Sequence, residues 1–73
     1  MGYVEIERGR GLNNADRYAR FQIDSNATDD DVDILAELAT LPDCGPGSVA
    51  INAKFDLMCV KKNDGTSWEI NRP

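Results

Sequence analysis

The first third of the chain contains two segments in which apolar and polar side chains alternate. The alternation runs over Tyr3–Glu7 and again over Arg17–Asp24. A period of two residues is typical of a β-strand with one covered face. The second segment also allows a short helix lined by Ala15, Tyr18 and Ala19, but its alternation favours a strand. We therefore expect two N-terminal strands joined by a polar, glycine-containing connection.

Helical periodicity follows in the middle of the chain, from about residue 29 to residue 41. Thr28 suits the N-cap position, and Asp31 follows three residues later. Pro42 should end the helix, because the residue before a proline is disfavoured in the helical region. The positions with helical spacing predict the buried stripe, which consists of Val32, Leu35, Leu38 and Ala39, widened by Ile34 and Leu41.

The last third has the pattern of an antiparallel β-meander over residues 44–71. Asn-Asp-Gly is a strong hairpin signal, and the apolar runs on both sides of it are short enough to be strands. The expected parts are a turn at 44–47, strands at 48–53 and 57–61, a turn at Asn63-Asp64-Gly65 and a last strand with Trp68 and Ile70. Together with the helix, these strands predict the core anchors Leu35, Leu38, Val49, Ile51, Trp68 and Ile70.

These elements predict one small α+β domain over residues 1–73. It combines N-terminal strands, one short helix at about 29–41 and the C-terminal three-stranded meander in a small antiparallel sheet. Residues 1–16, which include Gly9 and Gly11, can alternatively form an extended arm on another subunit. Hydrophobic residues make up 41% of the chain and seven of them are alanine, so the core is thin. We expect a partner subunit to complete it.

The net charge of −5 originates in the middle of the chain, where residues 24–43 hold seven carboxylates and no basic residue. Helix capping and a solvated acidic face explain this run. A calcium loop that starts at Asp24 would need glycine at position 29 and glutamate at position 35, and the sequence has neither. Arg8 and Arg10 flank a glycine as in RNA-binding segments, but the negative net charge disfavours nucleic acid. We expect these arginines to pair with carboxylates of a neighbouring subunit.

Histidine and cysteine, which often act in catalysis and bind zinc, are scarce in this chain. The chain has no histidine and two cysteines, Cys44 and Cys59, which we interpret as free thiols. We therefore expect no enzymatic activity, no cofactor and no metal. The start of the sequence has neither a basic leader nor an apolar run, and no stretch approaches the ~20 apolar residues that span a membrane. These features predict an intracellular protein with no membrane partner.

The second half of the chain carries a characteristic series of motifs. Leu41-Pro42 leads into Pro46-Gly47-Ser48-Val49-Ala50, an apolar strand covers Leu57–Val60, and Asn63–Ile70 contains an Asp-Gly turn followed by tryptophan. This series, over about residues 38–70, resembles a module of small structural proteins of tailed bacteriophages and prophages. The resemblance implies a non-enzymatic virion component that decorates the capsid or serves as a head-fibre-like accessory.

The resemblance also implies partners and a location. The expected partners are the major capsid protein or another virion protein, in a homo-oligomer or bound to the capsid lattice, after assembly in the bacterial host cytoplasm. We expect Tyr3–Glu7 to add as a strand to a neighbouring sheet. The expected interface residues are Tyr3, Glu5, Glu7, Arg8, Arg10 and Tyr18.

A second function remains open from the charge pattern. A small acidic phage-encoded inhibitor could use the face formed by residues 24–43 as a phosphate mimic. Such a face would bind a basic, nucleic-acid-binding surface of a host protein.

Overall fold

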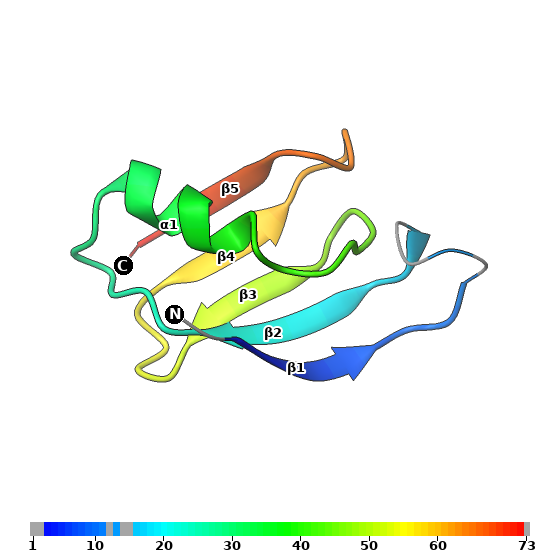
Figure 1. Cartoon of the computed structure of the whole chain (residues 1–73), viewed down its shortest axis with the longest axis horizontal. Coiled ribbons are helices and arrows are strands. Elements are labelled where there is room, and N and C mark those ends of the chain that lie inside the picture. The colour runs from blue at the N-terminus through cyan, green and yellow to red at the C-terminus, as the bar shows by residue number, and fades with distance from the viewer. Residues whose placement is uncertain (1–2, 12, 14–15, 73) are drawn as a thin grey trace.

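The computed structural model describes residues 3–11, 13 and 16–72. It contains one five-stranded sheet, in the order β1-β2-β3-β4-β5, and one helix (Figure 1). The elements are β1 Tyr3–Arg8, β2 Ala19–Ile23, α1 Asp31–Leu38, β3 Val49–Asn52, β4 Met58–Lys61 and β5 Trp68–Asn71. This arrangement confirms the predicted α+β fold class. No helix within the described ranges is long and apolar enough to cross a membrane.

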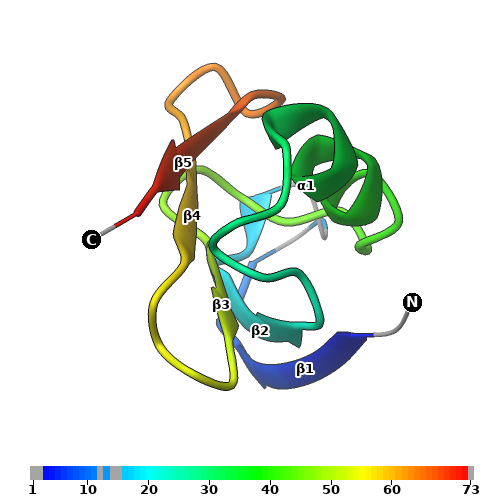
Figure 2. The ribbon, with the colours of Figure 1, turned by 90° about the vertical axis from the view of Figure 1, so that its left-hand side faces the viewer.

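One parallel strand pair joins the two halves of the sheet. β1 and β2 are antiparallel, and β3, β4 and β5 form the predicted antiparallel meander. β2 and β3 run parallel, so the sheet is mixed and not wholly antiparallel as predicted. A parallel connection must cross one face of the sheet, and α1 lies in that connection. The sheet curls round α1 on this face (Figure 2). We call the opposite face the open face, because no described element covers it.

The arm predicted as an alternative for residues 1–16 is not present over Tyr3–Arg8. These residues form β1 and pair with β2 of the same sheet. Residues 1–2, 12 and 14–15 of the proposed arm lie outside the described residues.

The hydrophobic core lies between α1 and the sheet. Alternation in β2 turns Ala19, Phe21 and Ile23 to this side, as the sequence predicted, and all three are at most 1% exposed. Phe21 lies beside Ala50 of β3, which in turn lies beside Cys59 of β4. Among the described residues, the buried apolar side chains are Ala19, Phe21, Ile23, Ile34, Leu38, Cys44, Ala50, Leu57 and Cys59.

The helix is shorter than predicted, and its cap is different. It begins after Asp30, because the Thr28 region forms a turn in which the Asp29 N–H donates to the Asn26 carbonyl at 3.0 Å. It ends at Leu38 rather than near residue 41, because the Thr40 N–H donates to the Glu37 carbonyl at 3.0 Å and closes a tighter turn.

The buried stripe of α1 also differs from the prediction. Ile34, Glu37 and Leu38 are buried, whereas Val32 is 76% and Leu35 is 44% exposed. The helix is rotated because the Glu37 carboxylate accepts backbone hydrogen bonds below it, which places Ile34 and Leu38 over the sheet. Leu35 is therefore not a core anchor.

The faces of β3 are the reverse of those predicted. Ala50 and Asn52 point to the core, so the predicted anchors Val49 and Ile51 lie half-buried on the open face. The parallel pairing with β2 sets this register, and the small Ala50 leaves room for Phe21 beside it. Of the other predicted anchors, Leu38 is buried, and Trp68 and Ile70 pack half-buried against the core.

Two loops depend on glycine and aspartate. A Cβ on Gly45 would lie 2.8 Å from the Asp16 carbonyl carbon, so only glycine fits this contact between loops. In the β4–β5 hairpin, Asp64 Oδ1 accepts the N–H groups of Thr66 and Ser67, each at 2.8 Å. These hydrogen bonds and that of the Ser67 hydroxyl lower the pKa of Asp64. The Asn-Asp-Gly turn is thus stabilised as its sequence predicts.

Candidate interaction surfaces

β1 forms a free edge of the sheet. Within the described part of the chain, it is the longest strand and β2 is its only strand neighbour, and residues 3–7 are exposed. The register shifts between Glu5 and Glu7, which places a bulge at Ile6. The outer backbone groups of an edge strand can pair with a strand of another chain. This edge includes most of the interface predicted from the sequence.

Arg8 binds within its own chain, although the sequence suggested a role toward a neighbour. Its Nε and Nη2 donate to Glu5 Oε1 at 3.1 and 2.8 Å, and Nη1 donates to the Asp43 carbonyl at 2.8 Å. The guanidinium carbon lies 5.8 Å from the centroid of the Phe21 ring. The hydrogen bond from Arg8 lowers the pKa of Glu5, and the same bond raises the pKa of Arg8. Both side chains therefore stabilise β1 itself.

The other predicted interface residues remain accessible around this edge. Tyr3 is 41% exposed and packs edge-on against Phe21, with the ring centroids 5.9 Å apart. Glu7 lies opposite Arg20 of β2, on the open face. Arg10 is exposed and Tyr18 is 39% exposed. Arg10 follows β1 and Tyr18 precedes β2, so both lie at the same end of the β1–β2 hairpin.

The open face carries apolar side chains that the sequence analysis did not assign to a surface. Val49, Ile51 and Val60 are half-buried there, and Met58 is 48% exposed. This surface was not predicted, because the alternation in the sequence placed Val49 and Ile51 in the core. The one available signal was the small Ala50 between them, since a residue beneath a helix has less room than one on an uncovered face.

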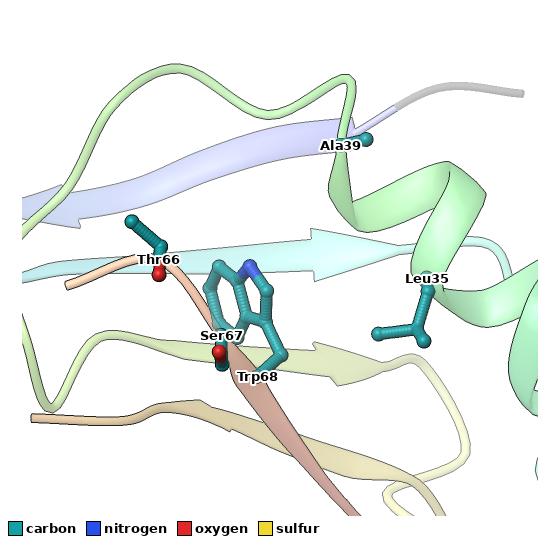
Figure 3. Close-up of a pocket in the computed structure, with 5 residues that line it drawn as sticks. All are labelled: Leu35, Ala39, Thr66, Ser67 and Trp68. Carbon is teal, nitrogen blue, oxygen red and sulfur yellow. The ribbon is translucent and has the colours of Figure 1, made fainter. Parts of the chain in front are cut away.

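A groove lies between α1 and the β4–β5 hairpin (Figure 3). Its volume is about 320 Å³, and its lining residues are Leu35, Ala39, Thr66, Ser67 and Trp68. The indole of Trp68 stands between the helix residues and the hairpin turn. Lys61 Nζ lies 5.6 Å from the centroid of the Trp68 ring. Two residues predicted as core anchors, Leu35 and Trp68, thus line a surface groove.

Some carboxylates in the acidic middle of the chain accept hydrogen bonds that stabilise the fold. Glu37 is 1% exposed and accepts the N–H groups of Asp24 and Ser25 at 3.0 and 2.9 Å, as well as the Ser25 hydroxyl. Asp29 Oδ2 accepts the Asn26 N–H at 2.9 Å. Glu37 thus connects the segment after β2 to the helix, and Asp29 stabilises the turn within that segment.

Further along the same acidic run, Asp31 forms an ion pair with Arg72. A hollow of about 130 Å³ between these elements is lined by Asp24, Ser25, Asp29, Asp33 and Glu37. In the part of the chain that the structure covers, no three cysteine or carboxylate side chains are grouped as metal ligands. Asp30 and Asp33 are left as exposed acids at the start of α1.

Both cysteines are free, as expected from the sequence, and both are buried. Burial raises the pKa of the Cys59 thiol from 9.0 to about 11. A thiol with a raised pKa is a poor nucleophile, because the thiolate is the reactive form. Cys59 lies beneath α1 as a small apolar side chain.

In comparisons with known proteins, no protein-family model, curated protein or solved structure matches the chain.

Proposed function

We propose that this chain is a non-enzymatic structural protein of a tailed-phage virion, which binds the capsid as a decoration or head-fibre-like accessory. Two lines of support lead to this proposal. The motifs over about residues 38–70 resemble those of small phage structural proteins. The free edge of β1 is the observation that carries the mechanism, since it offers unpaired backbone groups to another subunit.

Docking would occur by strand addition. A strand of the major capsid protein or of another virion protein pairs with the outer edge of β1, and main-chain hydrogen bonds supply the affinity. The exposed side chains of β1 then contribute specificity, because alternate residues point to opposite faces of the extended sheet. Val4, at 60% exposure, and Ile6, at 53%, are the apolar members of this edge.

Mass spectrometry of purified particles from the source phage or prophage tests the virion role directly. We expect the polypeptide at roughly tens to hundreds of copies per particle, as repeated binding to a symmetric lattice requires. Its absence from intact particles would contradict the proposal.

A charge variant of β1 tests the docking mode. Lysine on an edge strand opposes strand addition, so Val4→Lys with Ile6→Lys should lower incorporation into particles about tenfold or more. The matched control is Val32→Lys, where the side chain is 76% exposed and belongs to α1 rather than to the edge strand. Equal incorporation of the edge variant and the control would contradict docking through β1.

The same assay distinguishes the inhibitor that the charge pattern left open. Asp30→Asn with Asp33→Asn removes two exposed charges that make no contact needed for the fold. We expect this variant to enter particles normally. An inhibitor would lose binding to its basic host target, because the phosphate-mimicking charge is reduced.

A further inference from the structure

The open face carries two rows of side chains that cross four strands. From β2 to β5, the first row reads Arg20, Val49, Val60 and Glu69, and the second reads Gln22, Ile51, Met58 and Asn71. In each row, the two apolar side chains of β3 and β4 lie between two polar side chains. Arg20 and Glu69, which flank the two apolar side chains of the first row, have opposite charges, and β1 extends the two rows with Glu7 and Val4.

These rows are complementary to a second copy of themselves. A two-fold axis that runs parallel to the strands, between β3 and β4, places β3 opposite β4 and β2 opposite β5 of the other copy. Apolar side chains then meet apolar side chains, and each cation meets an anion. The facing pairs, each formed twice, are Val49 with Val60, Ile51 with Met58, Arg20 with Glu69 and Gln22 with Asn71.

Other orientations lose this match. A two-fold axis across the strands exchanges the two rows, so Arg20 would face Gln22 and Glu69 would face Asn71. Arg20 and Glu69 belong to neither ion pair found among the described residues. Within the chain, Glu7 lies beside Arg20. Of the two orientations, the axis along the strands is the one that places an opposite charge of the second copy across from both Arg20 and Glu69.

The proposed axis also passes beside the β3–β4 loop. Phe55 in this loop is 79% exposed and has a φ of 60°, which is uncommon for a bulky residue. The Asn52 side chain holds the loop, since it accepts the N–H groups of Asp56 and Leu57 at 3.2 Å each and donates to Asp56 Oδ1 at 2.6 Å. Because the loop joins β3 to β4, the axis between these strands brings the Phe55 loops of both copies to the same end.

We propose that the open face is the interface of a symmetric dimer of this chain, in which two sheets stack with the α1 helices outside. The sheet curls toward α1, so the open face is convex and the contact centres on β3 and β4 (Figure 2). The two rows contribute fewer residues than the roughly 20–30 per partner of a standard stable interface. The dimer is therefore reversible and forms as the concentration rises. This inference goes beyond the virion role and does not depend on it.

Sedimentation equilibrium from micromolar to millimolar concentration tests the dimer. The mass should rise from that of one chain to that of two. Arg20→Glu and Glu69→Arg should each weaken dimerisation about tenfold or more, because two attractive pairs become repulsive. The double variant Arg20→Glu with Glu69→Arg should recover dimerisation, since it restores opposite charges in both pairs. Val32→Lys, outside the interface, should dimerise as the native chain does.

A second variant avoids any effect of charge on folding. Phe55→Asn introduces a residue type that tolerates positive φ, and it should weaken dimerisation without lowering the melting temperature. A chain that stays monomeric at all concentrations would overturn the proposal. So would single charge reversals without effect, or a folded double variant that fails to recover, because the dimer would then use another surface. None of these results alters the particle assay, so the two proposals can fail separately.

Discussion

Single side chains in this small protein carry several structural roles at once. Glu37 occupies a core position yet holds the backbone after β2, and Asn52 points inward from β3 yet orders the β3–β4 loop. Both polar groups are buried and satisfied by hydrogen bonds, as every buried side-chain nitrogen or oxygen of the described residues is. Polar anchors thus supplement a thin apolar core.

Cys59 gives a pH-dependent prediction at this scale. Its pKa near 11 lowers the thiolate fraction at pH 8 about a hundredfold relative to a thiol with the pKa of 9.0. In a Cys44→Ala background, labelling by a thiol reagent at pH 8 should therefore be at least about a hundredfold slower in the folded chain than in urea. Equal rates in the two states would contradict burial of this thiol.

The raised pKa of Cys59 also predicts that the folded state loses stability at alkaline pH. Because the folded state binds the Cys59 proton more tightly than the unfolded state, its contribution is complete below about pH 9 and is lost as the pH rises toward 11. Unfolding in urea at several alkaline pH values should show this loss in the native chain, and Cys59→Ala should lack that component.

Among the elements, α1 shows what a local sequence pattern can predict: its position, but not its buried face. Periodicity located the helix correctly, but it could not choose among the faces of a helix that has apolar residues on most sides. The choice depends on where the Glu37 carboxylate finds hydrogen-bond donors. These donors are the backbone N–H groups of Asp24 and Ser25, which lie outside the helix in the segment after β2. The stripe that sequence reasoning placed inside includes Leu35, which lines the groove beside Trp68.

Alanine substitutions on α1 test the observed face. Ile34→Ala should lower the free energy of unfolding by about 3 kcal/mol, because it removes a fully buried side chain and leaves a cavity. Leu35→Ala should cost less than about 1 kcal/mol, because Leu35 is 44% exposed. Urea unfolding of both variants measures the difference. Similar losses, or a larger loss for Leu35→Ala, would show that the helix presents the other face.

For the molecule as a whole, the sequence indicated the pieces but not their connection. Alternation predicted β2, and the Asn-Asp-Gly turn predicted the meander, because these signals are local. The parallel pairing of β2 with β3 joins segments separated by all of α1, and no local pattern specifies it. That pairing also reversed the expected faces of β3, so the open face and its self-complementary rows could not be predicted.

Arg8 links the two halves of the molecule a second time. It bridges Glu5 on β1, the Phe21 ring on β2 and the Asp43 carbonyl in the loop before β3. Arg8→Ala should lower the melting temperature by about 5 °C, since it removes hydrogen bonds to a charged group. Arg10→Ala, which alters a nearby exposed arginine, should leave it unchanged. Thermal unfolding followed by circular dichroism compares them, and equal melting temperatures would refute this role of Arg8.

The order of the strands has a practical consequence for labelling. β1 begins and β5 ends at the same end of the sheet as the β3–β4 loop (Figure 1), since Tyr3 pairs with Ile23 and Asn71 with Met58. A fluorophore attached at Tyr3 or at Asn71 will therefore lie at that end. The opposite end, which carries the hairpin turn of Asp64 and the close contact of Gly45, remains unlabelled. The position of the label on a particle would therefore show the orientation of the bound subunit.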